Sequence, residues 1–368
     1  MKLTLDLVAG ARPNLMKLAP VVRALVAQDR LAFRIVHTGQ HYDPSMTDVF
    51  FQELGIPAPD VHLDVGSGSH GAQTARILER YEARLLTDPP RATVVFGDVN
   101  STVACALAAV KLGVGVVHVE AGLRSLDRSM PEEINRLLTD AIADLLLVSE
   151  PSGLEHLERE GIAADKVRLV GNVMIDTLLQ RLPAARARRA TRPLGLEGRP
   201  YGFVTLHRPS NVDDPATLGR LLDLLDELSS RLPLVFPVHP RTLASAHRAG
   251  LEPRLAPGNP RLVCLGPTPY LETLSLVAEA SLVLTDSGGL QEETSVLHVP
   301  CLTLRENTER PVTVSRGTSR LVGNDPARIR GAFTDVLEGR WPPGGDIPLW
   351  DGRAGARVAG AIADWLGA

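Results

Sequence analysis

The sequence predicts an α/β fold made of two doubly wound, Rossmann-like domains. Short runs rich in Leu and β-branched residues alternate with amphipathic helical patterns, and this alternation is typical of parallel sheets. The alternation is interrupted at residues 180–200, where Pro, Gly and Arg accumulate, and then it starts again. A length of 368 residues suits two domains that each bury a core. We therefore expect an N-terminal domain at 1–180, a linker at 180–200 and a C-terminal domain at 200–350.

Each predicted domain contains a series of short apolar strands. In the first domain they are LTLDLVA from 3, FRIVHT from 33, ATVVFGD from 92, GVVHVEA from 115, LLLVSE from 145 and VRLVGN from 167. In the second they are YGFVTLH from 201, LPLVFPVHP from 232, RLVCLGP from 261, ASLVLTDSGG from 280, VPCLTLRE from 299 and SRLVG from 319. The last segment, 353–368, has the pattern of an amphipathic helix, which either closes the second domain or packs on the first.

The composition points to a small anionic ligand. A formal charge of −4 and a pI near 6.2 argue against a general nucleic-acid or membrane-surface binder. Cys105, Cys264 and Cys301 lie far apart without CxxC spacing, so we expect core thiols and neither a disulfide framework nor a zinc site. Asp6 and Arg12 interrupt the N-terminal apolar stretch, and no apolar run has the length of a membrane span, so we expect a cytoplasmic protein.

Polar residues follow the predicted strands, and ligands of open parallel sheets bind beyond the carboxyl ends of the strands. Gly10, Arg12 and Lys17 follow the first strand. No GxGxxG fingerprint is present here, which argues against a dinucleotide site in this domain. The two cations either hold an anion at the helix start or are ordinary surface charges.

Carboxylates follow the strands that begin at 92 and 115. Asp98 is either a helix cap or a functional acid. Because the two strands are successive, we expect Asp98 and Glu120 at the same sheet edge, near the helix start that carries Glu132. Three carboxylates in one place perturb one another's pKa values, which suits acid–base chemistry better than stability.

The stretch HVEAGLRSLDRSMPEEINR, 118–136, is dense in charge after an apolar strand. Ser129 and Glu132, with Pro131 between them, have the spacing of a capping box. Glu132 also lies one turn before Arg136, which favours an ion pair between them. These two features account for half of the charges but leave Glu120 and Arg124 unexplained.

In the second domain, polar segments follow two of the predicted strands. His207 and Arg208 follow the strand from 201. Ser287, Gly288 and Gly289 lie between a strand and a helix, where backbone amides cradle a phosphate or diphosphate, unless the segment is a plain glycine turn. Glu292 or Glu293 could then reach ribose hydroxyls. After the next strand, Arg305, Glu309 and Arg310 add charge that could reach the same diphosphate.

With these motifs in hand, the chain resembles the non-hydrolysing UDP-N-acetylglucosamine 2-epimerase family over nearly its whole length. The motifs occur in family order: GARPNLMKLAP, TGQH, GDVNST, HVEAGLRS, MPEEINR, GN-x-MID from 171, LHRPSN, PVHP, TDSGGLQEE and TERP. The resemblance implies a two-domain fold of GT-B type, with a nucleotide sugar bound in the interdomain cleft, and a homodimer.

The resemblance also implies roles for individual residues. Those that match the family's active site are Arg12, Lys17, Asp98, Glu120, Glu132, Arg136 and His207. Those that match its UDP-binding residues are Ser287, Gly288, Gly289, Glu293 and Arg310. Two features depart from familiar members: Asn14 replaces the glutamate of GTRPE, and VGSGSHGAQT, 65–74, lacks the Arg-Gln pair of members that a second UDP-GlcNAc activates.

The implied reaction is reversible epimerisation at C2 of UDP-GlcNAc, giving UDP-ManNAc through 2-acetamidoglucal and UDP, with no metal or nicotinamide cofactor. Asp98, Glu120 and Glu132 would share the proton transfers, with Arg136 orienting Glu132. The alternatives are a hydrolysing relative that releases ManNAc, a GT-B glycosyltransferase and a non-catalytic sensor. The pathway served, envelope polysaccharide or a secondary metabolite such as an antibiotic, stays open.

Overall fold

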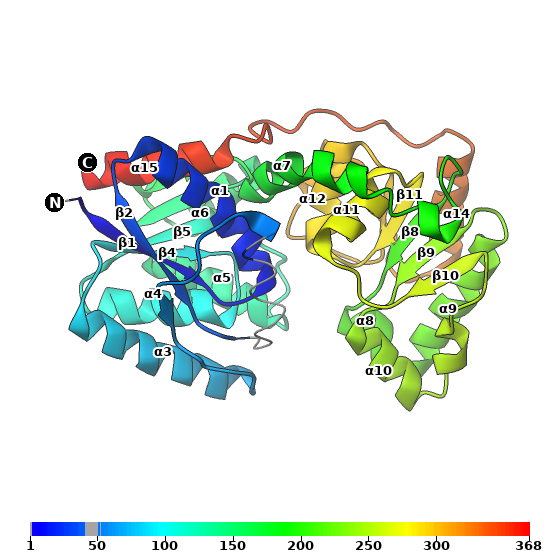
Figure 1. Ribbon diagram of the computed structural model, residues 1–368, viewed down its shortest axis with the longest axis horizontal. Coiled ribbons are helices and arrows are strands. Elements are labelled where there is room, and N and C mark those ends of the chain that lie inside the picture. The colour runs from blue at the N-terminus through cyan, green and yellow to red at the C-terminus, as the bar shows by residue number, and fades with distance from the viewer. Residues whose placement is uncertain (1, 41–50, 52) are drawn as a thin grey trace. The chain divides into compact units, whose positions relative to one another are not determined.

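The structure, a computed structural model, describes residues 2–40, 51 and 53–368, apart from the side chain of Arg12 (Figure 1). The chain forms two compact units. The first holds the residues up to Thr177 together with Pro348–Ala368, and the second is Leu178–Ile347.

The first unit contains, within the described residues, a seven-stranded sheet in the order β3-β2-β1-β4-β5-β6-β7. All neighbouring strands pair in parallel. The strands are β1 (Thr4–Ala9), β2 (Ala32–His37), β3 (Val61–His62), β4 (Ala92–Phe96), β5 (Gly115–Ala121), β6 (Leu145–Val148) and β7 (Val167–Leu169). The helices are α1 (Arg12–Gln28), α3 (His70–Thr87), α4 (Asn100–Lys111), α5 (Pro131–Ile142), α6 (Pro151–Arg159), η1 (Ala164–Lys166) and α15 (Ala354–Leu366), with α7 (Val173–Arg188) at the boundary of the two units.

The second unit contains a six-stranded parallel sheet in the order β10-β9-β8-β11-β12-β13. The strands are β8 (Gly202–Thr205), β9 (Leu234–Pro237), β10 (Leu262–Leu265), β11 (Leu282–Thr285), β12 (Cys301–Thr303) and β13 (Ser319–Leu321). The helices are η2 (Arg192–Leu194), α8 (Pro209–Val212), α9 (Pro215–Ser229), α10 (Pro240–Arg248), η3 (Glu252–Leu255), α11 (Tyr270–Ala278), α12 (Gly288–Leu297), α13 (Val312–Ser315) and α14 (Pro326–Leu337).

These two sheets confirm the predicted fold class. In each, the first strand lies inside the sheet, and the chain adds strands on one side before it crosses to the other, which is double winding. All the strands predicted from apolar runs are present, because strands buried on both faces read as continuous apolar segments. The two-residue strand β3 was missed because two residues give no periodic signal.

The connections between the units differ from a simple linker. The region 180–200 contains the end of α7 and η2, so the chain passes from the first unit to the second inside a helix. The final helix, α15, packs against α1 in the first unit. A Cβ atom added to Gly355 of α15 would lie 2.6 Å from the carbonyl oxygen of Pro20, so glycine allows this close approach.

Each unit has an apolar core on both sides of its sheet. Val94 and Leu147 in the first sheet and Val204 and Leu284 in the second are fully buried. The three cysteines are free and buried, as expected of core thiols. Among the described helices, none is long and apolar enough to cross a membrane.

Candidate active site

Asp98 follows β4 at the carboxyl end of the first sheet. Gly97 before it has a φ of +65°, which favours glycine, and α4 begins two residues after Asp98. No side chain of the described residues caps α4, so the alternative in which Asp98 is a helix cap is wrong. Its carboxylate instead accepts a hydrogen bond from Nη1 of Arg136 at 2.5 Å, and its side chain remains 27% exposed. Asp98 is thus a fixed but accessible acid.

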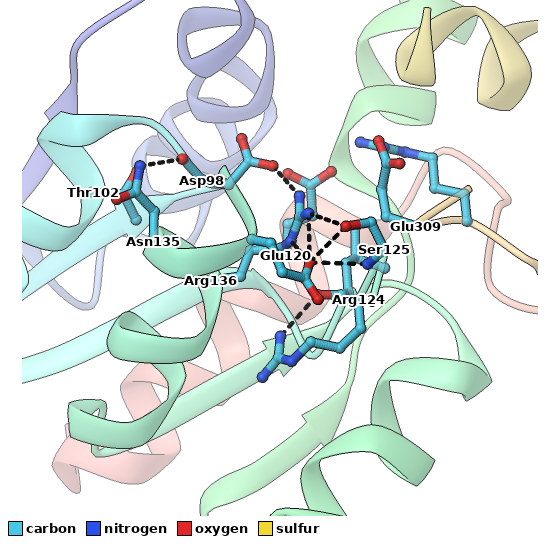
Figure 2. Close-up of polar contacts among 12 residues, drawn as sticks. Asp98, Thr102, Glu120, Arg124, Ser125, Asn135, Arg136 and Glu309 are labelled. Atoms are coloured by element: carbon cyan, nitrogen blue, oxygen red, sulfur yellow. Dashed lines mark hydrogen bonds and ion pairs between the residues drawn. The ribbon is translucent and has the colours of Figure 1, made fainter. Parts of the chain in front are cut away.

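Arg136 on α5 joins the acids at this sheet edge (Figure 2). Its side chain is 2% exposed. Nε and Nη2 donate to one carboxylate oxygen of Glu133 at 3.1 and 2.7 Å. Asn135, one residue earlier, donates to the backbone oxygen of Asp98 at 2.9 Å. Two consecutive residues of α5 therefore hold Asp98, one by its carboxylate and one by its main chain.

The predicted capping box and the Glu132–Arg136 ion pair are wrong. Helix α5 begins at Pro131, and within the described residues no side chain, including that of Ser129, caps it. The helix therefore starts one residue later than expected, so the third helical position falls on Glu133, and Glu133 reaches Arg136. The half-buried Glu132 carboxylate makes no hydrogen bond or ion pair within the described residues.

Glu133 ties the segment after β5 to the start of α5. Its two carboxylate oxygens accept the backbone N–H groups of Ser125 and Leu126 at 2.9 and 3.0 Å. Burial alone would raise the pKa of Glu133, but these hydrogen bonds and Arg136 bring it below its usual value. Glu133 is therefore an ionised carboxylate with a structural role.

Glu120 lies at an irregularity of the sheet. The register of β5 against β6 shifts between Val119 and Ala121, and Glu120 has a φ of +73°, a strained conformation for a residue with a side chain. Lys17 of α1 forms an ion pair with its carboxylate, so the alternative in which Lys17 is an ordinary surface charge is wrong. Both residues are 6% exposed. Removing either partner would leave a costly buried charge.

Asn14 replaces glutamate in the first motif, and the structure explains what it does. Its Oδ1 accepts the N–H of Ala11 at 3.0 Å, and its Nδ2 donates to the backbone oxygen of Phe96 at 2.7 Å. An ionised glutamate has no proton to donate to that oxygen. Asn14 therefore joins the start of α1 to the end of β4. The Arg12 side chain lies outside the described part of the structure.

Sequence reasoning missed His118 and Asp140. The ring of His118 lies between Asp140 and the carbonyl oxygen of Gly97, and all three are fully or almost fully enclosed at the sheet edge. Spacing gave a partial signal, because His118 lies two residues before Glu120 on one strand, and Asp140 lies one helical turn after Arg136.

In the second unit, α12 begins with the predicted glycine turn. Ser287 is the N-cap, and within the described residues its side chain accepts no capping hydrogen bond. The first amides of the helix are therefore available to an anion. A Cβ atom on Gly288 would lie 2.6 Å from Nη1 of Arg310 and 2.7 Å from Oε1 of Glu309, whereas one on Gly289 would meet nothing within 4 Å.

Arg310 lies beside this turn in a buried charge network. It donates to Glu292 through Nε and to Glu309 through Nη1, both at 2.5 Å. Arg305 donates to the other oxygen of Glu309 at 2.7 Å. Glu292 is thus engaged by Arg310 through its carboxylate.

Glu293 is buried, and the hydroxyl of Tyr270 donates to it at 3.2 Å. Burial, with a smaller contribution from the Glu292 charge, raises the pKa of Glu293 to about 7, although the Tyr270 hydrogen bond acts in the opposite direction. Near neutral pH this carboxyl can therefore either donate or accept a hydrogen bond.

His207 follows β8 and pairs with Asp286, which follows β11. Nδ1 of His207 lies 2.9 Å from the Asp286 carboxylate, which also accepts the backbone N–H groups of His207 and Arg208. Burial would raise the pKa of Asp286, but His207 and these N–H groups keep it below its usual value. Nδ1 of His207 therefore donates, which leaves Nε2 for a ligand.

No metal is suggested by the described residues, which contain no group of three or more His, Cys, Asp or Glu side chains that could hold one.

The fold and the residues at its sheet edges define a two-unit α/β protein of GT-B type. Residues 23–363 match the family described as UDP-N-acetylglucosamine 2-epimerase, and the chain belongs to that family. The resemblance predicted from the sequence is thus confirmed.

Individual relatives agree with this assignment. A protein of Methanococcus maripaludis named UDP-N-acetylglucosamine 2-epimerase is 39% identical over 97% of this chain and 98% of its own length. A protein of Pseudomonas aeruginosa named UDP-2,3-diacetamido-2,3-dideoxy-D-glucuronate 2-epimerase is 43% identical over 86% of this chain and 87% of its own. The crystal structure of Methanocaldococcus jannaschii UDP-GlcNAc 2-epimerase in complex with UDP-GlcNAc and UDP superposes with a TM-score of 0.90, at 40% identity, over 98% of this chain and 99% of that chain.

Proposed function

We propose that this protein interconverts UDP-GlcNAc and UDP-ManNAc without releasing free sugar. The observation that carries the proposal is the acid group at the ends of β4 and β5, where Arg136 fixes Asp98 and Lys17 fixes Glu120, in a family named for 2-epimerisation.

The chemistry explains why several acids are needed. The C2 proton of an N-acetyl sugar is not acidic, because no carbonyl adjoins C2. When the C1–O bond to UDP breaks, positive charge develops at C1 and acidifies C2–H. A carboxylate takes that proton, and the electron pair of the C–H bond forms the C1–C2 double bond of 2-acetamidoglucal. In the reverse steps a proton is added to the opposite face of C2, and a phosphate oxygen of UDP attacks C1.

We assign the proton transfers to Asp98, Glu120 and Glu132. Asp98 is accessible and is held in place by Arg136, so we propose it as one of the two groups that act at C2. Glu132, whose carboxylate is unoccupied within the described residues, is the second candidate. Glu120 already shares its charge with Lys17, which favours a supporting role.

The second unit would stabilise the leaving group. The amides of Gly288 and Gly289, with Ser287, Arg310 and Arg12, would bind the diphosphate and balance the charge that builds on UDP as the C1–O bond breaks. In its doubly protonated form, His207 would donate to a phosphate oxygen through Nε2 while Nδ1 still donates to Asp286. Glu293 would bind the ribose hydroxyls.

Proton NMR of the enzyme with UDP-GlcNAc in D2O tests this proposal. We expect UDP-ManNAc to appear and deuterium to enter C2 of both epimers. Lasting free ManNAc would instead identify a hydrolysing enzyme. A glycosyltransferase would leave C2–H unexchanged, and either outcome would reject the proposed reaction.

The relative named for a diacetamido glucuronate is 43% identical over 86% of this chain, and the M. maripaludis epimerase is 39% identical over 97% of it. This favours UDP-2,3-diacetamido-2,3-dideoxy-D-glucuronate as a second candidate substrate for the same C2 chemistry. Parallel assays with both nucleotide sugars, each followed by C2 deuterium incorporation, separate the two by kcat/KM.

A further inference from the structure

His118 has the hydrogen-bonding pattern of a doubly protonated imidazole. Its side chain is fully buried on β5. Nδ1 lies 2.6 Å from Oδ1 of Asp140, and Nε2 lies 2.8 Å from the carbonyl oxygen of Gly97. A carbonyl oxygen only accepts, and an ionised carboxylate only accepts, so both ring nitrogens must carry hydrogen to satisfy this geometry.

This protonation of His118 requires Asp140 to be ionised, because a neutral Asp140 could donate a hydrogen bond to Nδ1 instead. Its other oxygen, Oδ2, accepts the N–H of Gly122 at 3.0 Å and lies 2.7 Å from Nη2 of Arg124. Burial would raise the pKa of Asp140, but His118 and Arg124 bring it below the usual value. The charge of Arg124 does not depend on His118 and also pairs with Asp140, so the geometry favours Asp140 as the carboxylate and His118 as its doubly protonated partner.

A chain of alternating charges supports this buried cation. Arg124 donates to both oxygens of Glu160, at 2.8 and 2.7 Å, and Glu160 is 33% exposed. The sequence of charges from His118 to Glu160 is positive, negative, positive, negative, so the buried network is neutral overall. A buried charge is tolerated when it is paired and hydrogen-bonded in this way.

The inner end of this chain meets the turn that carries Asp98. His118 holds the carbonyl oxygen of Gly97, which belongs to the peptide joining Gly97 to Asp98. Asn135 holds the next carbonyl oxygen, and Arg136 holds the Asp98 carboxylate. With His118, the carbonyl oxygens of Gly97 and Asp98 and the Asp98 carboxylate each accept from a donor held by the surrounding fold.

We propose that His118, as a buried imidazolium, is a positioning residue that fixes the Gly97–Asp98 peptide and so aims Asp98 at the reacting carbon. This proposal rests on the proposed function, because it concerns how Asp98 is aimed for the C2 reaction. His118 itself acts through the turn and contacts no substrate in this mechanism.

A matched pair of variants separates its two hydrogen bonds. In His118→Asn the side-chain amide reaches the place of Nδ1 and keeps a donor for Asp140, but it loses the bond to Gly97. In His118→Gln the longer amide reaches the place of Nε2 and keeps a donor for Gly97. We expect kcat to fall at least tenfold in His118→Asn, with KM changed less than threefold, and to be partly restored in His118→Gln. Equal kcat in His118→Asn and the wild type would overturn the proposal.

Two NMR measurements do not depend on activity. In protein with ¹⁵N-labelled histidine, both ring nitrogens of His118, assigned by their loss in His118→Asn, should be protonated at the pH of the assay. A bare ring nitrogen would overturn the imidazolium assignment.

With ¹³C-carbonyl glycine and ¹⁵N-aspartate, only two peptides are doubly labelled, Gly97–Asp98 and Gly345–Asp346. The first signal should move in His118→Asn and stay near its place in His118→Gln, while the second stays unchanged in both.

These measurements also separate this inference from the proposed function. A wild-type protein that turns over neither nucleotide sugar would reject the proposed function, and the peptide signals would still show whether His118 holds the turn. An active wild type in which the Gly97–Asp98 signal is the same in His118→Asn would reject the positioning role alone.

Discussion

The guanidinium of Arg136 lies between two carboxylates of different character, with Nη1 2.5 Å from Asp98 and Nη2 2.7 Å from Glu133. Glu133 is saturated by backbone N–H groups, whereas Asp98 is partly exposed. One arginine thus connects a structural acid to an acid that can reach a ligand.

Asp98→Asn is predicted to keep the fold and lose the reaction. The amide oxygen can still accept from Arg136, so the hydrogen bond persists while the base is removed. We expect turnover of UDP-GlcNAc to fall by about 100-fold or more, the usual contribution of a general acid or base. Turnover and C2 deuterium exchange in one sample check this, with thermal unfolding as the control for the fold. Exchange at the wild-type rate would exclude Asp98 from both proton transfers.

Gly288→Ala and Gly289→Ala are predicted to act differently. A Cβ on Gly288 would meet Arg310 and Glu309 at 2.6 and 2.7 Å, so Gly288→Ala should displace Arg310 and lower both the melting temperature and the affinity for UDP. The loss of a charge-assisted hydrogen bond is worth about 1.5–3 kcal/mol, or about 10- to 100-fold in Kd.

Gly289→Ala has free space around the new methyl group in the protein alone. Because alanine favours a helix over glycine by up to about 1 kcal/mol, its melting temperature should stay or rise. If the diphosphate occupies that space, its affinity for UDP should nevertheless fall. Calorimetric titration with UDP and thermal unfolding check both variants. Undiminished UDP binding in both would place the diphosphate elsewhere.

Stability should depend on pH through Glu293. Its pKa is raised to about 7 in the folded protein, above the ordinary value of 4.5. The folded state therefore binds more protons than the unfolded chain between these values, so this contribution is fully present below pH 4.5 and is lost as pH rises through 7. The full effect is about 3 kcal/mol.

Glu293→Gln resembles the protonated side chain at every pH and should remove this loss. Urea unfolding at pH 5 and pH 8 should therefore show a smaller difference in free energy for the variant than for the wild type. The same pH difference in both proteins would show that Glu293 is ionised throughout.

How far the sequence predicts this site depends on the range of the interactions. Asp98 and Glu120 could be placed at one sheet edge because strand order follows from double winding and ligand residues follow strand ends. The partner of Arg136 could not be predicted in this way, because a shift of one residue in the start of α5 exchanges Glu132 for Glu133. The Lys17–Glu120 and His118–Asp140 contacts join separate elements, and local patterns carry no information on which side chains meet there.

The neighbouring acids Glu132 and Glu133 give the sharpest test of which carboxylates serve chemistry. Glu133→Gln replaces a buried acceptor of two backbone N–H groups and of Arg136. We expect it to lose about 1–3 kcal/mol of stability, as buried hydrogen-bonding groups do when a partner is altered. Glu132→Gln changes a half-buried carboxylate with no partner within the described residues, so its melting temperature should stay near that of the wild type. If Glu132 transfers a proton at C2, its turnover should nevertheless fall by about 100-fold or more. The two variants should therefore differ in what they change. Glu133→Gln should chiefly lower the stability of the fold, and Glu132→Gln should chiefly lower the turnover rate. Circular dichroism melting and turnover, measured on the same preparations, decide between the roles, because a stable and fully active Glu132→Gln would remove Glu132 from the mechanism and leave Asp98 and Glu120 as the acids that act at C2.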